Sequence, residues 1–132
     1  MTLAVDTSVL ICIARSELQA EAWVSILADA QTEGDLVICD VVAAEFFALL
    51  LHEQKFKESL STLGISFNPM SIEAAQLAGR ILKQYRQEGG PREHLIPDFL
   101  IGAHAQLQAD RLAATDRGYL RRYFPRLKVV TP

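Results

Sequence analysis

The sequence predicts an α/β domain, a three-layer α/β/α sandwich with a mostly parallel central sheet. Short apolar runs alternate along the chain with longer stretches of helical periodicity, which is typical of this architecture. The chain has 132 residues, enough to bury a core without a disulfide or a structural metal. Half of the residues are apolar and 22% are charged, which excludes a disordered chain. We therefore expect one domain over residues 1–132.

The strands are predicted from short apolar runs, most of which stop at a polar residue. The first run stops at Asp6, the second follows a break at Gly34-Asp35, and the third stops at Asn68-Pro69. In chain order, the predicted strands are 3–5, 36–39, 65–67, 112–115 and 128–130.

The segments between these runs have the composition and spacing of helices. Thr7-Ser8 opens the first helix, and Asp40 is a plausible N-cap for a very apolar one. Gly64 ends a more polar helix, and Pro97 stands where helices begin. In chain order, the predicted helices are 7–15, 19–31, 40–51, 53–63, 71–87, 97–109 and 117–124.

The two cysteines, Cys12 and Cys39, lie in apolar runs. They are expected to be buried free thiols in a reducing compartment, with a disulfide between them as the alternative. No Cys/His spacing indicates a zinc site. The N-terminus has no basic region, and no run approaches the ~20 apolar residues that a membrane span requires. These observations predict a soluble, cytoplasmic protein without a signal peptide.

The charges are unevenly distributed although the net charge is only -3. Residues 1–54 hold nine acids and a single base, Arg15, whereas residues 55–132 hold twelve bases and seven acids. The last sixteen residues carry five bases and no acid. The net charge does not indicate a nucleic-acid partner, but the basic C-terminal segment leaves one open.

Four carboxylates stand next to apolar segments. Asp6, Asp98 and Asp116 each precede a predicted helix, where an N-cap is the plain structural explanation. Glu45 is the only charge between residues 41 and 51, in the middle of a helix. A carboxylate among apolar neighbours needs a cation or hydrogen bonds, so a buried salt bridge is the alternative for Glu45.

The predicted sheet brings these carboxylates together. Ligand sites in open parallel sheets lie beyond the carboxyl ends of the strands, where Asp6 and Asp116 are placed. Asp98 begins the helix that leads into the fourth strand, so it is expected at the same edge. Converging carboxylates repel one another unless a cation is bound, and oxygen-only ligands favour Mg²⁺ or Mn²⁺. Such a metal serves phosphodiester hydrolysis by activating water and holding a phosphate oxygen.

The same residues resemble the motifs of the PIN-domain ribonucleases, and among them the VapC-type toxins of bacterial toxin–antitoxin pairs. The Val-Asp-Thr-Ser at 5–8 is similar to the opening Asp-Thr-Ser motif of the family. Glu45 lies on an apolar helix after the second strand, as in the family. The Pro-Asp-Phe-Leu-Ile-Gly-Ala-His-Ala at 97–105 and the Ala-Thr-Asp-Arg-Gly-Tyr at 114–119 resemble its two later motifs. Their order and spacing match over essentially the whole chain.

This resemblance implies a PIN-like sandwich and metal-dependent cleavage of RNA. It implies that Asp6, Glu45, Asp98 and Asp116 form the acidic site for Mg²⁺ or Mn²⁺, with Asp6 and Asp98 as the direct ligands. The other two would hold a second ion or metal-bound waters, and one of them would orient the attacking water. The resemblance further implies a homodimer and an antitoxin protein that occupies the pocket groove.

Several further residues are candidates for supporting roles. Ser8 and Thr115 would hydrogen-bond a carboxylate, a metal-bound water or the scissile phosphate, with capping or a turn as the alternative. Tyr119, Tyr123 and Phe124 would stack on bases or pack in the core, and His104 is expected to be a satisfied core residue. The candidates for binding RNA phosphates, or else members of an ordinary solvated face, are Arg117, Arg121, Arg122 and Arg126.

Three other functions share parts of this pattern. A receiver-type signalling module has the same layout and an acidic pocket, but it requires adjacent acids after the first strand and a late Lys. A phosphatase of the Asp-x-Asp type requires an acid at position 8, where this chain has Ser8. A PIN domain that binds RNA or protein without cutting is the third alternative.

Overall fold

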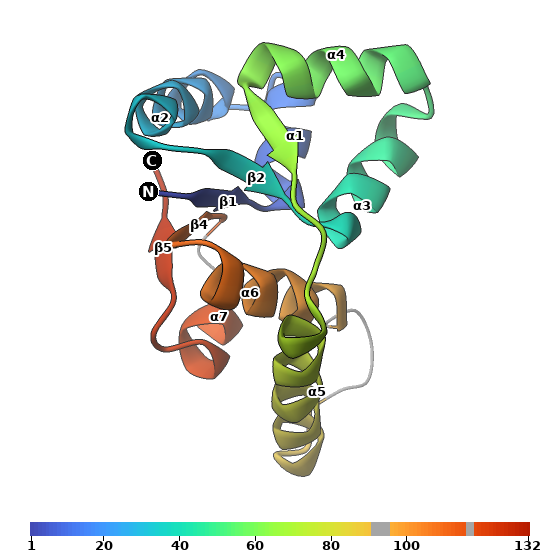
Figure 1. The fold of residues 1–132 in the computed structure, drawn as a ribbon, viewed down its shortest axis with the longest axis vertical. Helices are drawn as coiled ribbons and strands as arrows, with labels where there is room; N and C mark the ends of the chain where they lie inside the picture. Colours follow the sequence, from blue (N-terminus) through green and yellow to red (C-terminus); the bar gives the residue numbers. More distant parts are fainter. Residues whose placement is uncertain (91–95, 116–117) are drawn as a thin grey trace.

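The computed structural model of the chain describes residues 1–90, 96–115 and 118–132, with only the backbone of Tyr119. Within these residues a five-stranded, wholly parallel sheet is flanked by helices, which confirms the predicted fold class (Figure 1). The strands are β1 Leu3–Val5, β2 Leu36–Ile38, β3 Ile65–Phe67, β4 Arg111–Ala113 and β5 Lys128–Val130. The helices are α1 Thr7–Ala14, α2 Ala20–Glu33, α3 Asp40–Leu50, α4 Glu53–Leu63, α5 Ile72–Gln87, α6 Ile96–Gln108 and α7 Gly118–Tyr123.

The strand order of the sheet changes direction between β1 and β4. The order is β3-β2-β1-β4-β5, so the chain builds outward from β1 to β3 and then returns to the other side of β1. Val5 of β1 stands opposite Ala113 of β4, and the Asp6 amide donates to the Ala113 carbonyl at 2.9 Å. This junction of β1 and β4 is the switch point at which α/β sheets bind ligands.

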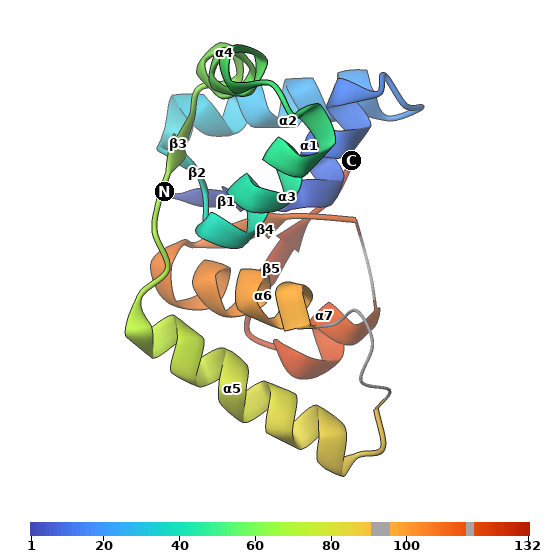
Figure 2. The same ribbon diagram turned by 90° about the vertical axis from the view of Figure 1, so that its right-hand side faces the viewer.

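Helices cover both faces of the sheet. Helices α1, α2 and α4 gather on one side, and α5, α6 and α7 gather on the other (Figure 2). Helix α3 contacts α1 and α4 on its own side and also α6. Because both faces are covered, the three residues of β1 and the three of β2 are all buried.

The core beneath α5, α6 and α7 is aromatic. The rings of Tyr85, Phe99 and Tyr123 contact one another edge to face, with centroids 5.3–5.6 Å apart. Phe124 packs against Phe99 and against Gly102 of α6, where a Cβ atom would lie 2.6 Å from the Phe124 ring. Tyr123 and Phe124 are therefore core residues, as the packing alternative predicted.

A partly buried hydrogen-bond network holds the chain where it crosses from β3 to α5. His104, which is 1% exposed on α6, contacts the Asn68 Oδ1 atom through Nε2 at 2.8 Å. Gln108 Nε2 donates to the same oxygen at 2.9 Å and to the Pro69 carbonyl at 2.9 Å. Burial lowers the pKa of His104 below its ordinary value, against the opposing influences of its hydrogen bond to Asn68 and of the Asp40 charge. The prediction that His104 is a satisfied core residue is confirmed.

Most element boundaries lie within two residues of the predicted ones, but the cap predicted for α3 is wrong. Cys39, not Asp40, is the N-cap residue of α3, and the Asp40 carboxylate instead accepts from the Met70 amide at 3.2 Å. Both cysteines are buried and free, as predicted, and burial raises the pKa of the Cys39 thiol. None of the helices in the described residues is long and apolar enough to cross a membrane.

Candidate active site at the carboxyl edge of the sheet

Asp6 stands at the end of β1 and is also the N-cap of α1. Its Oδ2 atom accepts hydrogen bonds from the Ser8 amide at 3.2 Å and from the Ser8 hydroxyl. The side chain is buried, with Asp6 8% exposed. The capping interpretation of Asp6 is thus confirmed, but these bonds occupy one carboxylate oxygen. Among the described residues no hydrogen bond reaches the other oxygen, Oδ1.

Glu45 is held beside Asp6 by a hydroxyl that was not among the predicted site residues, that of Thr7. The Thr7 Oγ1 atom donates to Glu45 Oε1 at 2.6 Å and links the first residue of α1 to the middle of α3. Thr7 is itself buried, at 7% exposed. Glu45 is exposed rather than enclosed by its apolar neighbours, so the buried salt bridge considered for it is wrong. The signal in the sequence was the hydroxyl directly after Asp6, but the 38-residue separation concealed its partner.

The residues that follow β4 lie next to Ser8 and form another wall of the site. The Thr115 amide lies 3.5 Å from the Ser8 Oγ atom, so Ser8 stands between Asp6 and Thr115. The predicted roles of Ser8 and Thr115 beside the carboxylates are thus compatible with their positions. Asp116 and Arg117, which follow directly, lie outside the described residues.

Asp98 lies in the first turn of α6 and is half-buried. Helix α6 is joined to β4 by two residues and reverses direction there, so its first turn is at the carboxyl edge of the sheet (Figure 2). Because Asp98 is the third residue of the helix, the N-cap interpretation is wrong for it. A carboxylate in a first helical turn is nevertheless favoured by the helix dipole.

The structure brings Asp6, Glu45, Ser8 and Thr115 together and places Asp98 at the same edge. Within the described residues, no three His, Cys, Asp or Glu side chains converge closely enough to hold a metal ion. The donors that are present are carboxylate and hydroxyl oxygens, the ligands that hard divalent cations prefer. No Lys, Arg or His side chain of the described residues forms an ion pair with Asp6 or Glu45.

Comparison with known families identifies the domain family of the chain. The profile of the PIN domain matches residues 3–125. The chain belongs to the PIN domain family.

Solved structures share the fold of this PIN domain over nearly its whole length. VapBC2 from Rickettsia felis, bound to a DNA fragment from its promoter, is 16% identical with a TM-score of 0.73, covering 98% of both chains. VapBC-1 from nontypeable Haemophilus influenzae is 17% identical with a TM-score of 0.69, covering 98% of this chain and 97% of the other. FitAcB from Neisseria gonorrhoeae is 22% identical with a TM-score of 0.66, covering 98% and 96%. No curated protein gives a significant match.

The basic helix α7 of this PIN domain is partly occupied by internal contacts. Arg122 Nη2 lies 2.9 Å from Glu88 Oε2, and the Tyr123 hydroxyl donates to the same oxygen at 2.7 Å. The Tyr123 hydrogen bond, more than Arg122, holds the pKa of Glu88 below its ordinary value. Arg121 and Arg126 are exposed. Of the four predicted phosphate-binding arginines, Arg122 therefore has a structural role as well.

Proposed function

We propose that this PIN domain is a metal-dependent endoribonuclease, the toxin component of a type II toxin–antitoxin pair. The observation that carries the proposal is the pair of carboxylates at the switch point of the sheet. Asp6 and Glu45 accept hydrogen bonds only from hydroxyls and one amide of the described residues, and no cation of these residues balances them. A divalent cation and an RNA phosphate are the ligands that fit such a site.

Each carboxylate has a proposed part in the reaction. Asp6, through its open Oδ1 atom, and Asp98 would hold Mg²⁺ or Mn²⁺ directly, whereas Glu45 and Asp116 would complete the acidic cluster. When bound there, a divalent ion would supply charge to polarise a phosphate oxygen and to lower the pKa of a bound water. Glu45 or Asp116 orients the attacking water, and Ser8 keeps the Asp6 carboxylate in one orientation.

The receiver-type alternative loses support from the strand order. Receiver modules have the order 2-1-3-4-5, and this sheet has the order β3-β2-β1-β4-β5. The Asp-x-Asp phosphatase lacks its second acid, since Ser8 occupies that position. A PIN domain that binds without cutting is the remaining alternative, and the cleavage experiment distinguishes it.

The proposed partners follow from the family. An antitoxin encoded by an adjacent gene is proposed because VapBC and FitAcB structures share the fold. A homodimer is proposed from the resemblance of the motifs to VapC-type toxins. Expression of the chain in a bacterial host should stop growth, and co-expression of the product of the adjacent small reading frame should restore it. The Asp6→Asn variant should be harmless without that product. Growth arrest that persists in Asp6→Asn would contradict a nuclease toxin.

The proposal is tested by incubating purified protein with structured RNAs, with and without Mg²⁺ or Mn²⁺. We expect cleavage that requires the metal and that Asp6→Asn and Asp98→Asn both abolish. Glu73→Gln, a neutralised exposed acid in the first turn of α5, is the matched control and should cut like the parent. RNA that is bound but left intact by the parent would favour the non-catalytic alternative.

A further inference from the structure

A groove of about 460 Å³ begins at the candidate active site and runs along the junction of α1 and α2. Ser8 and Thr115, which stand beside Asp6, line one end of it. Ile11 and Cys12 of α1 and Trp23 of α2 give it apolar walls. Its volume is in the range that accommodates a small organic ligand.

A second hollow of about 210 Å³ lies next to this groove and shares three of its residues. Gln19, Trp23 and Thr115 line both, and Thr131 and Pro132 extend the surface toward the C-terminus. The two hollows thus provide a path that leads away from the carboxylates on one side of the site.

The polar groups of the groove are unusual for a surface that receives nucleic acid. Among the described residues no Lys or Arg lines either hollow, whereas Glu17 does line the groove. The described lining of the groove therefore offers no cation to a phosphate. The side chain of Gln19, the N-cap residue of α2, makes no capping hydrogen bond. No hydrogen bond within the described residues uses the Glu17 carboxylate or the Gln19 amide, so both can bind a ligand.

We propose that this groove binds the nucleobase next to the scissile phosphate and thereby selects the RNA sequence that is cut. The inference rests on the proposed nuclease function, because the groove is continuous with the catalytic carboxylates through Ser8 and Thr115. A base suits the groove where a phosphate does not, since it is neutral and has apolar faces. Exposed Leu18 and the Ile11–Cys12 wall contact those faces.

Glu17 and Gln19 supply the selection. A carboxylate accepts hydrogen bonds from an exocyclic amino group, and a glutamine amide both donates and accepts along one base edge. Single-stranded RNA is read in this way, with its bases turned outward and hydrogen-bonded on their edges. A base that presents amino hydrogens to Glu17 is therefore favoured over one that presents only carbonyl oxygens.

Binding can be measured without cleavage. Trp23 is the only tryptophan of the chain and lines the groove, so its indole N–H gives a single reporter resonance in an NMR spectrum. The four ribonucleoside 5′-monophosphates contain no phosphodiester bond, and each is titrated into the protein with and without Mg²⁺. We expect shifts of the Trp23 indole and the Gln19 side-chain amide, with different affinities for the four bases. Nucleotides that leave both resonances unmoved overturn the proposal, whether or not the protein cuts RNA.

The cleavage arm uses Glu17→Gln and Gln19→Ala on an RNA library with a randomised segment. We expect the nucleotide preference beside the cut to change by about tenfold in both variants, the discrimination that one base-edge contact provides. Glu73→Gln and Gln76→Ala, at exposed positions of α5, are the matched controls and should keep the parent's preference. An unchanged preference in Glu17→Gln and Gln19→Ala overturns base selection even if cleavage itself is metal-dependent. If the adjacent gene's product shifts the Trp23 indole resonance but no nucleotide does, the groove is a protein-binding site and the proposal is overturned.

Discussion

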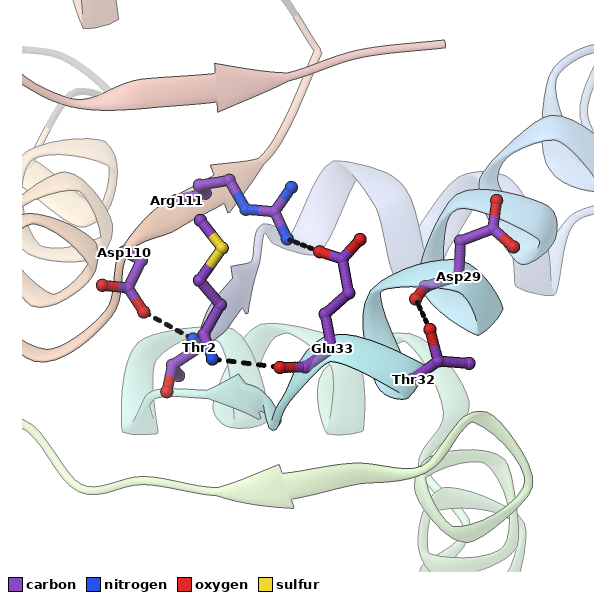
Figure 3. A network of polar contacts seen from close by, with 7 residues as sticks. Thr2, Asp29, Thr32, Glu33, Asp110 and Arg111 are labelled. Atoms are coloured by element: carbon purple, nitrogen blue, oxygen red, sulfur yellow. Dashed lines mark hydrogen bonds and ion pairs between the residues drawn. The ribbon is translucent and has the colours of Figure 1, made fainter.

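Carboxylates stand at both ends of the strands of the central sheet, but their partners at the amino end differ from those at the carboxyl end. At the amino end the carboxylates of Asp110 and Glu33 each contact a nitrogen of the fold (Figure 3). The Met1 amino group donates to the Glu33 carbonyl at 3.1 Å, and the Thr2 amide donates to Asp110 Oδ2 at 2.5 Å. Arg111 Nη2 lies 3.6 Å from Glu33 Oε2. These contacts hold the N-terminus against α2 and β4.

At the carboxyl end Asp6 and Glu45 have hydroxyl partners instead. Ser8 and Thr7 orient the two carboxylates but do not neutralise them. The amino end therefore forms contacts within the fold, and the carboxyl end retains a charge that a ligand can neutralise. The position of a carboxylate relative to the strand ends, more than its residue type, distinguishes the two.

The largest expected effect is the loss of RNA cleavage in Asp6→Asn, a variant that removes the charge of Asp6 but keeps its capping ability. Asn is as good an N-cap as Asp, so Asp6→Asn should leave the free energy of unfolding nearly unchanged. Cleavage of RNA should fall by about a hundredfold or more, as for other precisely placed charge-stabilising groups. Urea unfolding and initial cleavage rates measure the two quantities. Loss of stability together with activity would show that Asp6 serves mainly as a cap.

The next effect concerns Thr7, which positions Glu45. Thr7→Val has nearly the same shape but no hydroxyl to donate to Glu45 Oε1. We expect kcat to fall by about 10- to 100-fold with little change in KM, the cost typical of removing a group that orients a ligand. Thr7→Ser keeps the hydroxyl and should retain most of the activity. Equal losses in the Ser and Val variants would contradict the positioning role.

The third effect is a pH dependence of stability that arises from His104, which contacts the connection between β3 and α5. Because burial lowers the pKa of His104, the unfolded chain takes up a proton more readily than the folded chain. Stability from this group is present above the ordinary pKa of about 6.5 and is lost as the pH falls below it. Urea unfolding between about pH 7.5 and 5.5 should show this decline, and His104→Gln should flatten it. A His104→Gln variant with the parent's slope would contradict the assignment.

The smallest effect is expected at the amino end. The Arg111 Nε and Nη2 atoms are buried and make no hydrogen bond, and the ion pair to exposed Glu33 is long. Arg111→Met should therefore change the free energy of unfolding by no more than about 1 kcal/mol. It should leave RNA cleavage unchanged, because this end is remote from the site. A large loss of cleavage in Arg111→Met would remove the distinction between the two ends.

The elements were predictable because their signals are local. The strand Leu3–Val5 and the helix Glu53–Leu63 have the predicted bounds, since the apolar run of the strand stops at Asp6 and Gly64 ends the helix. Asp40 was predicted as the cap because Asp is a better capping residue than Cys. In the structure Cys39 occupies the N-cap position, and the Asp40 carboxylate accepts from the Met70 amide. Cap identity depends on backbone angles that composition does not reveal.

The site was predictable only in part because its contacts are tertiary. Asp6 and Ser8 are neighbours in sequence, and their placement beyond β1 followed from the strand pattern. The pairing of Thr7 with Glu45 and that of Arg122 with Glu88 join residues 38 and 34 positions apart. An apolar sequence context also suggested that Glu45 is buried, whereas the helix turns it outward. Packing geometry decides such cases.

The most direct test of the central claim is the melting temperature with and without metal. If the carboxyl edge binds Mg²⁺ or Mn²⁺, either ion at about 100 times its Kd should stabilise the parent by ~2.7 kcal/mol. Asp6→Asn should lose most of this gain, and Glu73→Gln should keep it. A parent that does not respond to either ion, or an Asp6→Asn variant that responds equally, would contradict a metal site built on Asp6.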